Sequence, residues 1–279
     1  MKNLLSLSQL NKQDVSRIFE VASQMRSITQ SAYKKNPQLS GRVIGGVWDN
    51  PCSSSTAFAL ATSYLGGTFV PTYNVENSLE QCVSLDNMGA NMVVVSCEND
   101  NLVTTFASAA HCAVINGGSN RYDPIGVLSD LFALYIKLDG LQNLTVLLVG
   151  NKNTNKVDEL TKILQLFNSS VVWYLPQDDL STQRRGIVLE KIESAFSGVD
   201  AVLDLGLTAY SDPTKYYGAN GGISSELMAK AGINATLLGT RNVVNNGCLQ
   251  KYENNAVDLR DNCYVSIVMA ILYLINQEK

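Results

Sequence analysis

The sequence predicts an α/β fold with two domains, each built on a mainly parallel sheet flanked by helices. Two observations support this prediction: the chain has 279 residues, 46% of them hydrophobic, and short apolar runs alternate with helical stretches along both halves. A chain of this length forms two ordinary domains more readily than one large core. Strands that alternate with helices form parallel sheets with helices on both faces.

The first half begins with a helix and continues with alternating elements. Residues 12–26 carry apolar side chains at helical spacing, and Asn11 is placed to cap the helix. The run 43–48 is typical of a buried strand, and a helix is expected from about residue 54 to 64. Further strands are expected at 92–95 and 113–115, and a further helix at 126–137.

The second half shows the same alternation of strands and helices. Strands are expected at 145–150, 171–174 and 201–205, and helices at 157–167 and 258–276. The polar segment 138–143 is taken as the junction between the domains. The predicted domains are therefore 1–138, completed by the closing helix 258–279, and 139–257.

Composition excludes several classes of function. A net charge of -4 offers no basic surface for nucleic acid. The N-terminus does not resemble a signal peptide, and no apolar run reaches membrane-spanning length, so we expect a cytoplasmic protein with no membrane contact. The six cysteines form no CxxC pair, which indicates reduced thiols. His111 is the single histidine and has no partner identifiable in the sequence, so we expect it to be structural, with no metal site and no cofactor.

Several segments, in matching order and spacing, resemble the catalytic chain of aspartate carbamoyltransferase. They are residues 3–10, 65–67, 116–120, Pro124 with 129–132, and 143–150. The resemblance implies the two-domain fold of the aspartate/ornithine carbamoyltransferase family and a homotrimer. It also implies a family role in pyrimidine biosynthesis, the transfer of a carbamoyl group from carbamoyl phosphate to aspartate.

The family binds the phosphate with an S-T-R-T motif at the start of a helix. In this sequence the matching stretch is 49–56, and Ser53 or Ser54, depending on the register, replaces the arginine. A helix N-terminus with hydroxyls can still bind an anion, although no guanidinium is present. The candidate ligand-binding residues here are Ser53, Ser54, Ser55 and Thr56. The alternative is a helix cap with exposed hydroxyl groups.

The HPxQ motif of the family is altered as well. Its histidine falls at Asp123 and its glutamine at Gly126, and a further family arginine falls near Ser96. An acid in this place repels a phosphate dianion. Asp123 is a candidate ligand residue, and it is explained equally by the start of a helix. Arg121 is a candidate replacement cation, with an ordinary surface arginine as the alternative.

The positions that hold the amino acid substrate in the family are also replaced. Its carboxylate-binding arginine and glutamine fall near Gly206 and Thr208, and its HPLPR loop retains only Arg241 as a candidate. Lys156 is a candidate for another binding arginine, with Asn155 as an equal alternative. The lysine-bearing loop of the family shortens to about 74–79 and contains no lysine.

Two functional hypotheses follow. In the first, the chain is a weak or inactive carbamoyltransferase homologue for which no catalytic residue is named. Such a protein would bind a small metabolite in an interdomain cleft, or assemble with an active paralogue or a regulatory subunit. In the second, it is an active carbamoyltransferase with an altered substrate or substitute site residues. A cluster of cations in the cleft would favour the second hypothesis.

Overall fold

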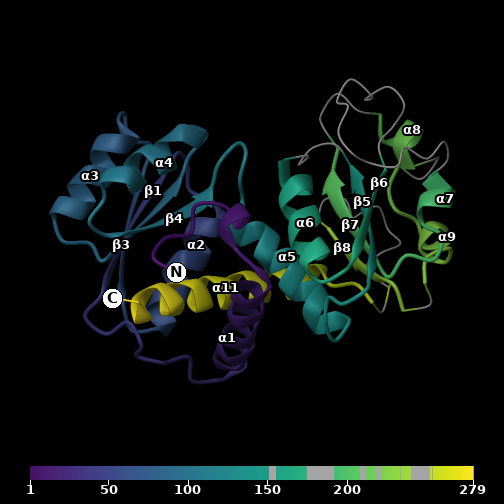
Figure 1. The fold of residues 1–279 in the computed structure, drawn as a ribbon, viewed down its shortest axis with the longest axis horizontal. Helices are drawn as coiled ribbons and strands as arrows, with labels where there is room; N and C mark the ends of the chain where they lie inside the picture. Colours follow the sequence, from purple (N-terminus) through teal and green to yellow (C-terminus); the bar gives the residue numbers. More distant parts are fainter. Residues whose placement is uncertain are drawn as a thin grey trace. The chain divides into compact units, whose positions relative to one another are not determined.

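The computed structural model describes residues 1–150, 155–174, 192–207, 212–217, 221–232, 234–239, 252 and 254–278. They form two compact units. Unit 1 is Met1–Phe132 with Asp261–Lys279, and unit 2 is Ala133–Arg260. Each unit contains a parallel four-stranded sheet with helices, as labelled in Figure 1. The predicted α/β fold class is confirmed.

Unit 1 has the strand order β2-β1-β3-β4. Its strands are β1 (Val43–Trp48), β2 (Thr68–Tyr73), β3 (Met92–Ser96) and β4 (Ala113–Gly118). Its helices are the short η1 (Leu7–Gln9), α1 (Lys12–Gln30), α2 (Ser53–Tyr64), α3 (Ser78–Asn87), α4 (Asp100–Ala109), α5 (Pro124–Lys137) and α11 (Val257–Gln277). The last two helices extend past the limits of the unit.

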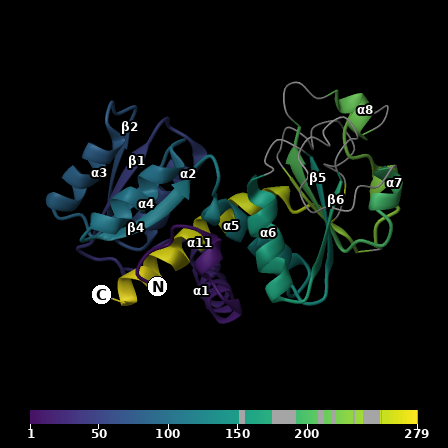
Figure 2. The same cartoon turned by 45° about the horizontal axis from the view of Figure 1, so that its top comes forward.

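The two faces of the unit 1 sheet are covered by different helices. Because side chains alternate along a strand, Val47 faces the cluster formed with α3 and α4. Trp48 faces the other way, and its ring packs at 5.8 Å from the ring of Phe58 on α2. Gly46 makes this packing feasible, since a Cβ there would lie only 2.0 Å from the Trp48 ring. Figure 2 shows these helices about the sheet.

Unit 2 has the strand order β6-β5-β7-β8. Its strands are β5 (Thr145–Gly150), β6 (Ser170–Tyr174), β7 (Ala201–Gly206) and β8 (Thr236–Leu238). Its helices are α6 (Asn155–Leu166), α7 (Ile192–Ala195), α8 (Pro213–Tyr217) and α9 (Ser225–Met228). Helix α6 lies on one side of this sheet, and α7 and α9 lie on the other (Figure 1).

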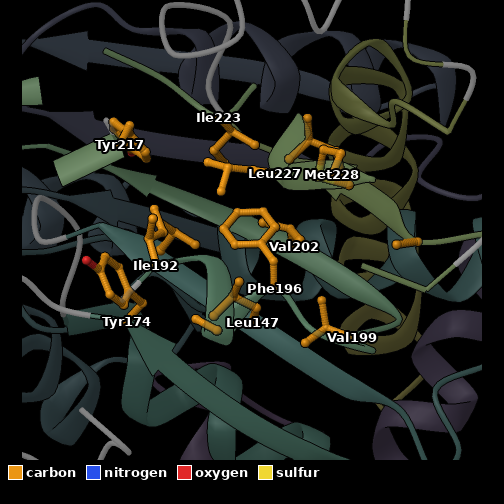
Figure 3. Packing of buried hydrophobic residues seen from close by; sticks show 14 residues of the cluster. Leu147, Tyr174, Ile192, Phe196, Val199, Val202, Tyr217, Ile223, Leu227 and Met228 are labelled. Carbon is orange, nitrogen blue, oxygen red and sulfur yellow. The ribbon is translucent and has the colours of Figure 1, made fainter. Parts of the chain in front are cut away.

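The core of unit 2 gathers around Phe196, which follows α7 and is fully buried. Figure 3 shows its ring among Leu147 and Val202 of the sheet and Ile223 and Leu227 near α9. These side chains come from adjacent parallel strands and from the helices on one side of the sheet. The apolar runs of the sequence therefore form the interior of the unit, where apolar burial is the main stabilising contribution.

The predicted elements are present, with ends that differ by a few residues. Asn11 caps α1 as expected: its side chain accepts a hydrogen bond from Asp14 N, and Asp14 accepts one from Asn11 N. The predicted end of the loop 74–79 is wrong by about two residues, because α3 already begins at Ser78. The elements that the sequence did not predict are η1, β2, α3, α4, α7, α8, α9 and β8.

Helix α5 continues to Lys137, so the expected junction at 138–143 directly follows a helix that crosses the limit between the units. Among the described helices, none combines the length and the apolar character needed to cross a membrane.

Candidate functional site

Both sheets have a point at which the strand order reverses. In unit 1 the chain passes outward from β1 to β2 and then returns to β3 on the other side of β1. Ligands of open α/β sheets bind outside the carboxyl ends of the two strands at such a point. In unit 1 this is the edge where β1 ends at Trp48 and β3 ends at Ser96.

A pocket of about 230 Å3 lies at this edge of unit 1. Its walls come from the ends of three strands and from the start of α2. They include Asp49 after β1, Ser96 and Glu98 at β3, Ser119 after β4, and Cys52 before α2. The topology thus brings together residues from three distant segments of the sequence at one open pocket.

Two hydrogen bonds connect the strand ends beyond the regular ladder. Asp49 N donates to Ser96 O at 3.2 Å. Glu98 N donates to Asp49 Oδ2 at 2.7 Å. The carboxylate of Asp49 therefore fixes the loop after β3 and also lines the pocket.

The charge of the pocket wall is negative. Asp49 and Glu98 are the charged residues of the wall, and the described part of the wall contains neither lysine nor arginine. Burial raises the pKa of the Cys97 thiol to about 11, and the nearby carboxylates of Asp49 and Asp100 add to this rise. The thiol is therefore neutral near pH 7, and the field around it is that of the carboxylates.

The predicted anion-binding residues lie in the first turn of α2, but their hydroxyl groups take part in local hydrogen bonds. Ser54 Oγ accepts a hydrogen bond from Trp48 Nε1 at 3.1 Å. Ser55 is buried, and its Oγ donates to Cys52 O at 2.8 Å. Thr56 Oγ1 makes a longer contact of 3.4 Å with the same carbonyl oxygen, and Ser53 is exposed. The hydroxyl groups of Ser54, Ser55 and Thr56 therefore have local partners at the start of α2.

Asp123 caps helix α5. Its Oδ1 accepts a hydrogen bond from Gly126 N at 3.0 Å, which is the geometry of an N-cap. It also borders the pocket, since a Cβ on the lining residue Gly118 would lie 3.9 Å from Asp123 Oδ1 and 3.6 Å from Ser96 Oγ. Arg121 is exposed, and its backbone N donates to Asp100 Oδ1 at 2.7 Å. Asp123 thus adds a further acid beside the pocket.

His111 has a partner in the structure that could not be identified from the sequence, namely Asp86. Its ring Nδ1 lies 3.2 Å from Asp86 Oδ2, and its backbone N donates to the same oxygen at 2.9 Å. Cys112 N donates to the other carboxylate oxygen at 2.8 Å. Partial burial opposes ionisation of Asp86, but the hydrogen bonds from His111 and Cys112 outweigh it and lower the pKa of this carboxyl group.

The other predicted site residues belong to unit 2. Lys156 lies half-buried in the first turn of α6, and Arg241 lies outside the described residues. The reversal point of this unit lies between β5 and β7, where Asp204 is buried. Asp204 Oδ1 accepts hydrogen bonds from Gly206 N and Tyr217 Oη, and burial raises the pKa of this carboxyl group to about 6.

Sequence reasoning did not select Asp49, Glu98 or Asp204 as site residues. A usable signal was present, because Asp49 directly follows the predicted strand 43–48 and Glu98 lies three residues after the predicted strand 92–95. In a parallel sheet these positions meet at one edge. The strand order that makes the two strands neighbours comes only from the fold.

Comparison with known proteins gives the same family as the sequence segments. Residues 2–135 match the family described as "Aspartate/ornithine carbamoyltransferase, carbamoyl-P binding domain". The aspartate carbamoyltransferase catalytic subunit of Caldicellulosiruptor bescii is 24% identical over 306 aligned positions, which cover 100% of this chain and 99% of that one. The catalytic subunit of Moorella thermoacetica is 27% identical over 159 positions, which cover 54% of this chain and 52% of that one.

Solved structures agree on the fold. Ornithine carbamoyltransferase from Thermus thermophilus superposes with a TM-score of 0.82 at 18% identity, covering 99% of both chains. Aspartate transcarbamoylase from Trypanosoma cruzi in complex with phosphate gives 0.80 at 20% identity, covering 98% of this chain and 94% of that one. The chain is therefore similar over its full length, at low identity, to an aspartate carbamoyltransferase catalytic subunit, and its residues 2–135 match the carbamoyl-P binding domain of the aspartate/ornithine carbamoyltransferase family.

Proposed function

We propose that this chain is an aspartate carbamoyltransferase-like protein that does not carry out carbamoyl transfer and binds a small polar ligand without a phosphate group. The observation that carries the proposal is the pocket of unit 1. Its wall contains two carboxylates, Asp49 and Glu98, and no cation among its described residues. Such a wall suits a neutral or polar ligand better than a phosphate, because carboxylates repel an anion.

Electrostatics argues against carbamoyl phosphate in this pocket. A phosphate dianion needs pre-placed cations or hydrogen-bond donors, whereas Asp49, Glu98 and the adjacent Asp123 repel it. Catalysis adds the need to stabilise charge that develops in the transition state, and the loss of one such donor typically lowers the rate by about 10²–10³-fold. The resemblance implies several such losses, so little activity remains even where their effects are not additive.

The alternative is an active carbamoyltransferase rebuilt from substitute residues. The remaining first turn of α2, together with Arg121, Lys156 and Arg241, supplies the candidate groups. The intramolecular hydrogen bonds of Ser54 and Ser55 make this alternative the weaker one, because those hydroxyls already have partners.

The test is an assay of purified protein with carbamoyl phosphate and either aspartate or ornithine. The Caldicellulosiruptor bescii catalytic subunit, run in parallel, verifies the assay. We expect no measurable turnover, and we expect that Ser54→Arg will not restore it because Asp123 still repels the phosphate. Robust activity that is abolished by changing Ser54, Lys156 or Arg241 would establish the alternative.

Assembly is a separate part of the proposal. We expect a cytoplasmic homotrimer, because the resemblance implies that quaternary structure. The chain would then act by binding its ligand, by assembling with an active paralogue or by binding a regulatory subunit. Co-purification from the source cells, with and without an active paralogue, would distinguish assembly from ligand binding alone.

A further inference from the structure

We propose that Asp204 and Tyr217 form a proton-controlled latch at the carboxyl edge of the unit 2 sheet. In the closed form, a protonated Asp204 accepts a hydrogen bond from the Tyr217 hydroxyl and holds α8 against the end of β7. Ionisation of Asp204 favours an open form, in which α8 has moved away and water reaches the carboxylate. This inference concerns unit 2 alone, so it does not depend on the function proposed for the unit 1 pocket.

The first observation is that the two carboxyl oxygens of Asp204 have unequal environments. Oδ1 accepts hydrogen bonds from Gly206 N at 2.7 Å and from Tyr217 Oη at 3.0 Å. Oδ2 is buried without a hydrogen-bond partner among the described residues, and Asp204 as a whole is only 5% exposed. A carboxylate with one oxygen neither hydrated nor bonded is costly to bury, whereas a proton on that oxygen removes the charge and leaves both bonds to Oδ1 in place.

The second observation concerns the charges around Asp204. The ion pairs found within the described residues all lie in unit 1. Apart from Tyr217, the described titratable side chains on the elements around Asp204 are those of Tyr174 on β6, Glu193 on α7, Asp212 before α8 and Glu226 on α9. These groups are neutral or negative, so they do not stabilise an ionised Asp204. Burial therefore outweighs the two hydrogen bonds and raises the pKa of this carboxyl group to about 6.

The third observation is that α8 depends on its contacts with the rest of the unit. It has five residues, which are too few for a stable isolated helix. Its start is exposed and bonded locally, because Asp212 Oδ1 accepts hydrogen bonds from Thr214 N at 2.9 Å and from Thr214 Oγ1 at 2.7 Å. Its last residue, Tyr217, is buried and packs in the core cluster of the unit (Figure 3). The bond from Tyr217 to Asp204 thus joins a short helix to a central strand of the sheet.

The position of Asp204 indicates which element moves. Val149 of β5 is its register partner on one side, and a Cβ on Gly239, after β8, would lie 3.0 Å from Asp204 Cβ. Hydrogen bonds of the ladder fix these neighbouring strands, so the movement that admits water is that of α8. The latch lies where the strand order of unit 2 reverses, which is the edge at which open α/β sheets bind ligands. It therefore makes access to this edge dependent on pH.

Hydrogen exchange of the full chain, followed by mass spectrometry and corrected for the intrinsic effect of pH, tests the latch. Because the pKa of Asp204 is raised in the closed form, closing is favoured most below pH 3.8, and this preference is lost as the pH rises through about 6. We expect the opening equilibrium at residues 204–206 and 213–217 to increase about 50-fold from pH 4 to pH 7. It should also exceed the opening equilibrium at 146–148 of β5, in the same unit, at both pH values.

Three variants separate the latch from other effects of pH. Asp204→Asn has no ionisable group at this place, so its opening equilibrium at 204–206 and 213–217 should not increase with pH. Tyr217→Phe removes a donor that favours the carboxylate, so the increase should be complete only at a higher pH than in the wild type. The matched control is Asp200→Asn, which changes the carboxyl group directly before β7 and should keep the wild-type increase.

Several outcomes would overturn the inference. A wild-type opening equilibrium that stays constant from pH 4 to pH 7, or an increase that persists in Asp204→Asn, would exclude the latch. Equal opening at 146–148 would also exclude it, since the proton would then act on unfolding of the whole unit. If Asp204→Asn does not fold, Tyr217→Phe decides, and an unchanged midpoint of the increase contradicts the latch. These measurements do not involve carbamoyl transfer, so their failure is distinguishable from failure of the proposed function.

Discussion

Asp204 is a buried acid at the reversal point of unit 2, and its environment is only partly polar. One carboxylate oxygen accepts hydrogen bonds from Gly206 N at 2.7 Å and from Tyr217 Oη at 3.0 Å. The other oxygen has no hydrogen-bond partner among the described residues. Burial therefore outweighs the two hydrogen bonds and raises the pKa to about 6 from its usual value of 3.8.

We predict that Asp204→Asn stabilises the protein at pH 8 and that this gain disappears near pH 4. The pKa of Asp204 is raised in the folded state, so its contribution to stability is fully present below pH 3.8 and is lost as the pH rises through about 6. A shift of this size corresponds to about 2–3 kcal/mol above pH 7. Urea unfolding of both proteins at the two pH values measures the difference, and a constant difference would contradict the assignment.

At the scale of residues, the structure gives local hydrogen bonds to two of the candidate residues named from the sequence. Ser54 and Asp123 lie beside the pocket, yet each is explained by a local bond, with Trp48 Nε1 and with Gly126 N. Such bonds depend on rotamers and loop paths that a motif does not encode. Asp49 and Glu98 were not selected because the motif comparison directs attention to residues that replace family cations.

At the scale of elements, Asp86 joins the end of α3 to the start of β4. We predict that Asp86→Asn lowers the free energy of unfolding by about 1–3 kcal/mol, because one of the backbone N–H groups of His111 and Cys112 then loses its acceptor. His111→Ala is the matched control. Its ring is 89% exposed, so its removal should change stability by less than about 0.5 kcal/mol.

The lowered pKa of Asp86 also leads to a prediction about the pH dependence of stability. Because the folded state lowers the pKa of Asp86, its stabilising contribution is present above the unfolded pKa and is lost as the pH falls through the folded value. The difference in stability between wild type and Asp86→Asn should therefore narrow in acid. A difference that stays equal from pH 7 to pH 3, measured by denaturant unfolding, would contradict this role.

The ends of β5 and β7 approach each other closely at Gly150 and Gly206. A Cβ on Gly150 would lie 2.5 Å from Gly206 O, and Gly150 has a φ of 118°. Gly140→Ala is the matched control, with a φ of 136° and open space around it, and we expect it to cost about 1 kcal/mol. Gly150→Ala adds the steric contact, so thermal unfolding should show a further loss of roughly 1–3 kcal/mol.

Elements with continuous apolar runs were predictable, and polar or mixed elements were not. β1, β3, β5 and β7 are buried on both faces, so their sequences are nearly all apolar, as expected for parallel strands. β2 was missed because it is a half-exposed edge strand containing Pro71. β8 has only three residues, and α3 carries too few apolar side chains to show a clear period.

At the scale of the whole chain, the two units share one strand order and each has an acid near its reversal point. Asp49 follows β1, and Asp204 lies near the end of β7. The chain has the fold of solved carbamoyltransferase structures, and the described wall of its unit 1 pocket contains two carboxylates and no cation. Fold and ligand preference are separable, because the core depends on apolar pattern and the pocket on a few residues after the strands.

The last prediction concerns assembly, which the resemblance to the family implies to be a homotrimer. Charged residues are 16% of the sequence, below the roughly 25% that is typical, and unit 1 exposes large apolar side chains such as Val70, Val83 and Met88. Weakly charged surface is compatible with contacts between copies. Light scattering at micromolar concentration should report a particle of three 30.3 kDa chains. A monomer at this concentration would refute the trimer.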